Sequence, residues 1–84
     1  MNIYKELNKI IEYIEEHLEE KIEAKNISKK IGMNEHTFQR IFALIAGISL
    51  TEYIRNRRLT NAGQDLYLNQ EKVMDVAIKY GYNN

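Results

Sequence analysis

The sequence predicts an all-α protein of five helices. Apolar residues recur at intervals of three and four along most of the chain, which is the spacing of a helix with one buried side. Proline is absent, whereas glycine and asparagine stand between the periodic segments and mark their ends. A chain of 84 residues suits one small domain with a single core.

The first helix is expected to begin after Asn2 and to run to about Glu20. Its apolar stripe consists of Leu7, Ile10, Ile11, Ile14 and Leu18. Like-charged pairs four residues apart, such as Glu12 and Glu16, and glutamates at the C-terminal end destabilise it locally. Packing of the stripe must therefore hold this helix, and we interpret its acidic side as a solvated surface rather than a metal site.

Two short helices joined by a tight corner follow, at about 24–31 and 35–46. Gly32 can end the first of them in the left-handed conformation, and Asn34 can cap the second. The second helix has an apolar side made of Phe38, Ile41, Phe42 and Ile45. Two helices joined by a short turn that contains glycine match the helix-turn-helix unit.

The opposite side of segment 35–46 carries polar side chains suited to base edges: His36, Gln39 and Arg40. Arg40 can donate two parallel hydrogen bonds to guanine O6 and N7, and Gln39 can pair with adenine N6 and N7. This side predicts a recognition helix that enters the major groove of double-stranded DNA. The competing interpretation is an ordinary solvated helix face. For His36, an exposed side chain without any contact is nearly as well supported as a base contact.

The fourth helix is expected at about 50–68. Ser49 and Glu52 have the spacing of a capping box, and Ile48 and Tyr53 that of a hydrophobic staple. Gly63 lies inside it and should cost about 1 kcal/mol relative to alanine. The side chains expected to face inward are Leu50, Tyr53, Ile54, Leu59, Ala62 and Leu66.

The fifth helix, at about 72–80, begins a second copy of an earlier pattern. Segment 24–34 and segment 73–83 share apolar or small residues on one helical side, followed by glycine, an apolar residue and asparagine. We therefore predict one complete helix-turn-helix unit and the first helix of another. Without a partner helix, Val73, Val76 and Tyr80 are expected to stay partly exposed, to fold back on the core, or to pair with a second copy.

Charge argues in two directions. The formal net charge is zero, which counts against nucleic-acid binding and leaves open a helical protein-interaction module that never touches DNA. However, residues 1–25 hold four Lys against seven Glu, whereas residues 26–58 hold six basic residues against two acidic ones. A cationic surface beside the two-helix unit could still face phosphates. Alternatively, Arg57 or Arg58 ties the fourth helix to the acidic first helix, a structural role that we slightly favour for Arg57.

The sequence gives little support for an enzyme, a metal-binding protein or a membrane protein. Cysteine is absent, no histidines have ligand spacing and no glycine-rich phosphate loop occurs, so we expect no enzyme activity, no metal and no cofactor. Neither a signal peptide nor an apolar run long enough to cross a bilayer is visible, so we expect a cytoplasmic protein without a membrane partner. His17 is interpreted as a helix-surface residue, and the tyrosines at 13, 53, 67, 80 and 82 as packing residues.

Four stretches in this order resemble the DNA-binding domain of AraC/XylS-type transcription regulators, which are bacterial proteins. They are Phe38-Gln39-Arg40-Ile41-Phe42, Gly47-Ile48-Ser49-Leu50, Tyr53-Ile54-Arg55-Asn56-Arg57-Arg58-Leu59 and Val76-Ala77-Ile78-Lys79-Tyr80-Gly81-Tyr82. The resemblance implies two helix-turn-helix units joined by a long helix. It divides the chain into a first unit at 1–48, a linker helix at 49–68 and an incomplete second unit at 69–84.

The resemblance also implies roles for single residues. His36, Gln39 and Arg40 match positions that face bases, and Asn34, Thr37 and Arg55 match positions near phosphates. The chain departs from the family pattern at Glu35, where a basic or neutral residue suits phosphate better, at Gly63, where alanine is usual, and in lacking the second recognition helix. A start with this domain implies an effector-binding domain downstream in a longer protein.

Overall fold

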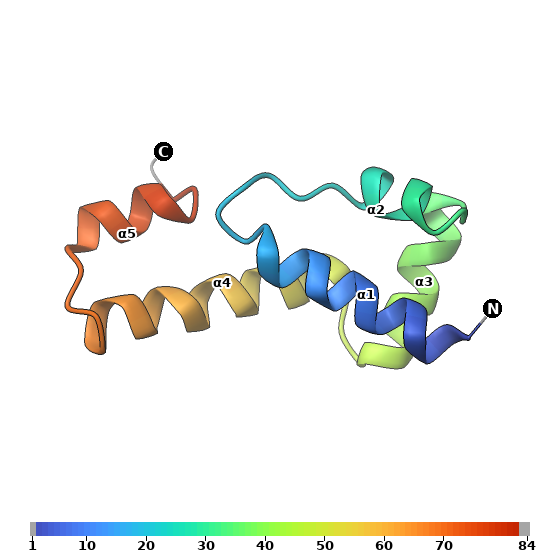
Figure 1. The fold of residues 1–84 in the computed structure, drawn as a ribbon, viewed down its shortest axis with the longest axis horizontal. Helices are drawn as coiled ribbons and strands as arrows, with labels where there is room; N and C mark the ends of the chain where they lie inside the picture. Colours follow the sequence, from blue (N-terminus) through green and yellow to red (C-terminus); the bar gives the residue numbers. More distant parts are fainter. Residues whose placement is uncertain (1, 83–84) are drawn as a thin grey trace.

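Five helices lie within residues 2–82, the part of the chain that the computed structural model describes. They are α1 (Ile3–Glu16), α2 (Ala24–Lys30), α3 (Glu35–Ala46), α4 (Leu50–Tyr67) and α5 (Val73–Lys79). The predicted all-α class is thus confirmed. The molecule measures 43 × 23 × 18 Å, and α4 runs along its length, with α1, α2 and α3 around one end and α5 over the other (Figure 1).

The helix starts follow the capping residues of the sequence. The side chain of Asn2 accepts hydrogen bonds from the backbone N–H groups of Tyr4 and Lys5 at the start of α1. Asn34 accepts from Thr37 N (3.2 Å), and Ser49 accepts from Glu52 N (3.1 Å), as the sequence predicted. Each cap satisfies a backbone donor that the helix itself leaves without a partner, and so fixes where α3 and α4 begin.

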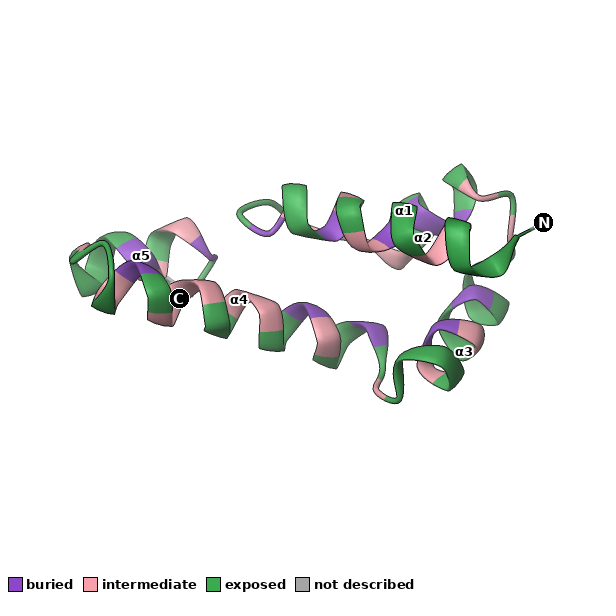
Figure 2. Cartoon of the chain, turned by 60° about the horizontal axis from the view of Figure 1, so that its bottom comes forward, coloured by how far each residue is buried: buried purple, intermediate pink, exposed green. Residues whose placement is uncertain are grey.

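One apolar core takes residues from all five helices. In Figure 2, buried (purple) segments alternate with exposed (green) ones along the helices, as expected for helices with one side in the core. Ile14, Ile27 and Phe42 are the largest fully enclosed side chains, and they come from α1, α2 and α3. The Phe42 ring meets Tyr53 of α4 edge to face, with ring centroids 5.7 Å apart. The remaining buried apolar residues are Ile10, Leu18, Phe38, Leu50, Ile54, Val76 and Tyr80.

The internal repeat predicted from the sequence has a structural counterpart. α2 and α5 are both seven residues long, and each is followed after its C-cap by a glycine with positive φ, Gly32 (68°) and Gly81 (82°). After each glycine the next N–H donates back into the helix, from Met33 to Ser28 O (2.9 Å) and from Tyr82 to the carbonyl five residues before it (2.7 Å). Asn83, the predicted cap of the second copy, lies outside the described residues.

The first helix ends earlier than predicted, at Glu16 instead of about Glu20. His17 is the C-cap and is half-buried rather than on the helix surface; its Nδ1 lies 2.6 Å from the carbonyl oxygen of Tyr13. Arg58 of α4 donates to the carbonyl oxygens of Leu18 (2.9 Å) and Glu20 (2.6 Å). Because these carbonyl oxygens accept hydrogen bonds from Arg58, residues 17–20 do not depend on helical hydrogen bonds. The glutamates of this turn also disfavour a longer helix, since negative charge at a helix C-terminus opposes the helix dipole.

Several side chains predicted to pack are exposed. Leu59, expected to face inward, is 55% exposed, because five residues after Ile54 the helix has turned by about 140° away from the core. Of the three residues in segment 72–80 for which exposure, folding back or pairing was left open, Val76 and Tyr80 fold back on the core and are buried, whereas Val73 stays 68% exposed. Tyr67 and Tyr82 are also exposed, whereas α2 and α5 each stop within about a turn of the predicted ends.

Candidate nucleic-acid interface

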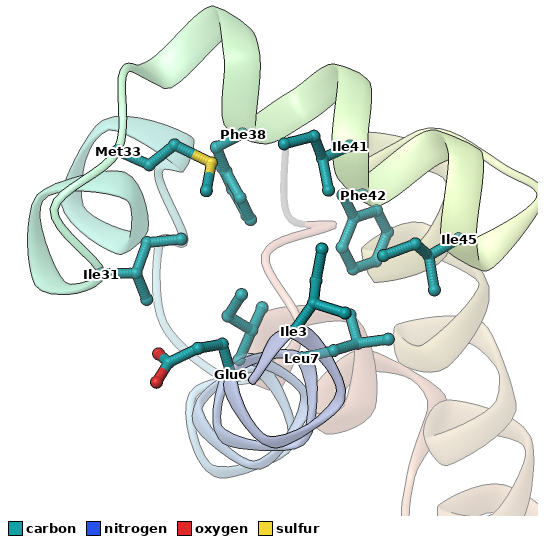
Figure 3. A pocket seen from close by; sticks show the side chains of 10 residues that line it. Ile3, Glu6, Leu7, Ile31, Met33, Phe38, Ile41, Phe42 and Ile45 are labelled. Carbon is teal, nitrogen blue, oxygen red and sulfur yellow. The ribbon is translucent and has the colours of Figure 1, made fainter. Parts of the chain in front are cut away.

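The back of α3 is anchored in the core. Phe38 and Phe42 are buried, and Ile41 and Ile45 border a small apolar pocket that α1 closes from the other side. In Figure 3, Ile3 and Leu7 of α1 point toward the α3 side chains across this pocket, while Ile31 and Met33 of the corner close one end. α3 is therefore held along its whole length, which leaves its other face free.

That free face carries the predicted trio. His36, Gln39 and Arg40 are all exposed, and the corner before them is a true turn and no continuous helix. The side chains occupy the first two turns of α3, next to the N–H groups at its start. A helix fixed on one side and polar on the other satisfies the geometric requirement for entering a groove, whereas base contact by these three residues stays a prediction.

The three residues predicted to lie near phosphates are exposed but occupy two places. Asn34 and Thr37 stand at the N-terminus of α3, where backbone N–H groups and the helix dipole favour an anion. Arg55 lies on α4, where its Nη2 is 3.8 Å from Glu52 Oε1. It borders a separate hollow of about 290 Å³ together with Arg58 and Tyr82.

Two of the neighbouring arginines have structural partners. Arg57 makes a forked contact with Glu15 of α1, as the sequence predicted, and this contact raises the pKa of the guanidinium further. Arg58 is held by the backbone carbonyls after α1. Both are therefore engaged in fixing α1 against α4, which leaves Arg40 and Arg55 as the exposed arginines.

Sequence reasoning missed a polar cluster that joins α4 to α5. The carboxylate of Asp65 accepts hydrogen bonds from Tyr80 Oη (2.8 Å), Lys79 Nζ (3.1 Å) and Asn69 Nδ2 (3.1 Å). The bond from Tyr80 is the main cause that lowers the pKa of Asp65, and burial is the main cause that raises the pKa of Tyr80 to about 12. Glu71 also contacts Lys79 (2.7 Å). In the sequence, the spacing of four residues between Asp65 and Asn69 was the one feature that could have indicated this cluster.

Among the described residues, the structure contains neither a candidate metal centre nor a candidate membrane-spanning helix. Between residues 2 and 82, no three His, Asp or Glu side chains gather in a way that could hold a metal ion. Within the same range, each helix is too short or too polar to cross a bilayer.

Comparisons with known proteins agree with this geometry. Residues 27–84 match the family described as "Helix-turn-helix domain". The chain is 31% identical over 78 residues to the transposon Tn10 TetD protein of Escherichia coli, covering 93% of this chain and 56% of that protein. It is 32% identical over 78 residues to the HTH-type transcriptional activator AarP of Providencia stuartii, covering 93% and 58%.

The multiple antibiotic resistance protein MarA of Escherichia coli K12 is 31% identical over 78 residues, with 93% of this chain and 61% of MarA covered. The chain thus spans between half and two thirds of the length of these relatives. The family match covers most of the chain, and the relatives align with nearly all of it, including the corner, the exposed face of α3 and the long α4. The chain belongs to the helix-turn-helix family of AraC/XylS-type transcription regulators.

Proposed function

We propose that this chain binds double-stranded DNA in a sequence-specific manner, with α3 in the major groove, as part of a transcription regulator. The observation that carries the proposal is the two-sided nature of α3: His36, Gln39 and Arg40 are exposed while Phe38 and Phe42 are buried. The relative AarP, named as a transcriptional activator, supports the same function.

In the proposed complex, Arg40 reads guanine and Gln39 reads adenine through paired hydrogen bonds, and His36 contacts a neighbouring base edge. Asn34 and Thr37 at the helix start and Arg55 on α4 lie near phosphates and set the register of α3 in the groove. Glu35 is exposed in the first turn of α3. In the proposed complex it points away from the DNA backbone, since its carboxylate would repel a phosphate beside it.

We also propose a separate role for each of three segments of the chain. Residues 1–48 form the base-reading unit, 49–68 the linker helix, and 69–84 the start of a second unit. The matching hydrogen-bond patterns that end α2 and α5 support the last assignment. An effector-binding domain downstream in the whole protein is a further proposal, which rests on the family resemblance alone.

The direct test measures binding to a selected duplex and to random duplexes over a series of salt concentrations. We expect affinity to fall steeply with salt on both, because counterions are released from phosphates, and to be higher on the selected duplex. Affinity that does not change with salt would contradict DNA binding altogether. Equal affinity for all duplexes would leave only non-specific binding.

A second property is proposed for α5. Val73, Met74 and Ile78 are exposed apolar residues on this helix, which favours self-association through residues 72–80. Sedimentation should then depend on concentration, and Ile78→Glu should abolish that dependence. Tyr4→Glu, at an exposed position of α1, serves as the matched control and should leave it unchanged. Monomeric sedimentation at all concentrations would contradict this property without bearing on DNA binding.

A further inference from the structure

Leu44 is an apolar side chain in an unexpected place. It lies on α3 and is 82% exposed, more than any other large apolar residue of that helix. It follows Arg40 by four residues and Thr37 by seven, so the three side chains form one line along the helix surface. Thr37, Arg40, Ile41 and Leu44 border a shallow hollow of about 210 Å³ on this surface.

The second half of α3 contains no hydrogen-bond donor or charge among its side chains. From position 41 to position 46 it reads Ile-Phe-Ala-Leu-Ile-Ala, and its last turn has no basic residue. This half of the helix therefore has nothing to offer a phosphate or a polar base edge. The contact that it can make in a major groove is apolar, and the one apolar group that base pairs present there is the C5-methyl group of thymine.

We propose that Leu44 reads a thymine, whose C5-methyl group enters the hollow beside Leu44 next to the base pair that Arg40 contacts. The inference rests on the proposed DNA binding and adds a specificity-determining residue to it. The isobutyl group of Leu44, the methyl group of Thr37 and the aliphatic stem of Arg40 would cover the thymine methyl from three sides. Binding would thereby remove from water the large apolar surface that Leu44 exposes in the free protein.

The test removes the methyl group alone. A high-affinity duplex is first selected from a random pool with the full protein chain, and each thymine of that duplex is then replaced in turn by uracil. One replacement should weaken wild-type binding about fourfold, which corresponds to about 0.8 kcal/mol for one buried methyl group. Leu44→Ala should bring the ratio between the thymine and uracil duplexes well below fourfold, because only Thr37 and the stem of Arg40 still cover the methyl group. Because Leu44 is exposed, this variant should keep the helical circular dichroism spectrum of the wild type.

Leu68→Ala is the matched control, because Leu68 is also highly exposed (77%) but lies at the far end of α4. It should retain the wild-type ratio between the thymine and uracil duplexes. The inference is overturned if no uracil replacement weakens wild-type binding, if Leu44→Ala retains the fourfold ratio, or if Leu68→Ala loses it. If no sequence can be selected at all, the proposed function fails and this inference fails with it; selection without a uracil effect overturns this inference alone.

Discussion

Arg57 of α4 and Glu15 of α1 form a forked ion pair, with Arg57 Nη2 2.7 Å from Glu15 Oε1 and Nε 3.0 Å from Oε2. Two parallel hydrogen bonds fix direction as well as distance, which a lysine could not do. The next residue, Arg58, holds the carbonyls that follow α1. These consecutive arginines therefore fasten α1, which supports α3 from behind, to the long helix.

Arg57→Ala should lower the free energy of unfolding by about 0.5–1 kcal/mol, because both side chains of the pair are partly solvated, each 35% exposed. For a domain of this size that loss lowers the melting temperature by roughly 2–8 °C. Thermal denaturation of Arg57→Ala, Glu15→Gln and the double variant measures the coupling. A much larger effect of Arg57→Ala on duplex affinity than on stability would show that Arg57 also contacts DNA.

Arg40→Ala should reduce discrimination at a single base pair by about 1–3 kcal/mol, because it removes the bidentate contact that we propose between Arg40 and one guanine. Affinity for duplexes that already lack that base pair should change little. Binding to a panel of single-base variants of the selected duplex provides the measurement. Equal losses on selected and random duplexes would mean that Arg40 contacts the backbone and reads no base.

Arg55→Ala should weaken binding to all duplexes by a similar factor. Arg55 is exposed on α4 and is assigned to a phosphate, so its removal should reduce the slope of log affinity against log salt by about one unit. Titrations of wild type and variant at several salt concentrations compare the two slopes. Arg55→Lys, which keeps the charge, should retain the slope, and a base-dependent loss in Arg55→Ala would contradict the assignment.

Gly63→Ala should stabilise the protein by up to about 1 kcal/mol. Gly63 lies inside α4, and a Cβ added there meets no atom within 4 Å, so alanine gains helix propensity without a clash. Chemical denaturation measures the change. Gly47→Ala, at the end of α3, is the contrasting variant and should be destabilising, because Gly47 has φ of 81°. A destabilised Gly63→Ala would mean that the position is constrained by something other than helix propensity.

The Asp65 cluster should make stability depend on acid pH. The pKa of Asp65 is lowered in the folded protein, chiefly by the hydrogen bond from Tyr80. Its contribution is therefore complete above the ordinary carboxyl pKa of about 3.9 and is lost as the pH falls through the lowered value. Urea denaturation of wild type and Asp65→Asn from pH 7 down to pH 2 should show the difference between them shrinking with acid. A difference independent of pH would mean that the Asp65 carboxylate is not stabilised by folding.

Local patterns predicted much of this molecule because local physics decides them. The caps at Asn34 and Ser49, the glycines after α2 and α3, and the burial of Ile10 and Ile14 on α1 depend on neighbours within a few residues, and each was confirmed. The exposure of His36, Gln39 and Arg40 followed from the same helical spacing that buries Phe38 and Phe42. These features require no knowledge of which helix packs on which.

Other features were settled only by contacts between distant segments. α1 ends at Glu16 because Arg58, some forty residues later, supplies partners for the carbonyls beyond it. Asp65 is buried because Lys79 and Tyr80 arrive from α5 to pair with its carboxylate, a desolvation that an unpaired aspartate would resist. Leu59 is exposed because no element covers that side of α4 within residues 2–82. The sequence alone determined the number of helices, the N-caps of α3 and α4 and the polar face of α3. The tertiary structure decided where α1 ends and which polar groups pair, since such pairing depends on distances that no local pattern encodes.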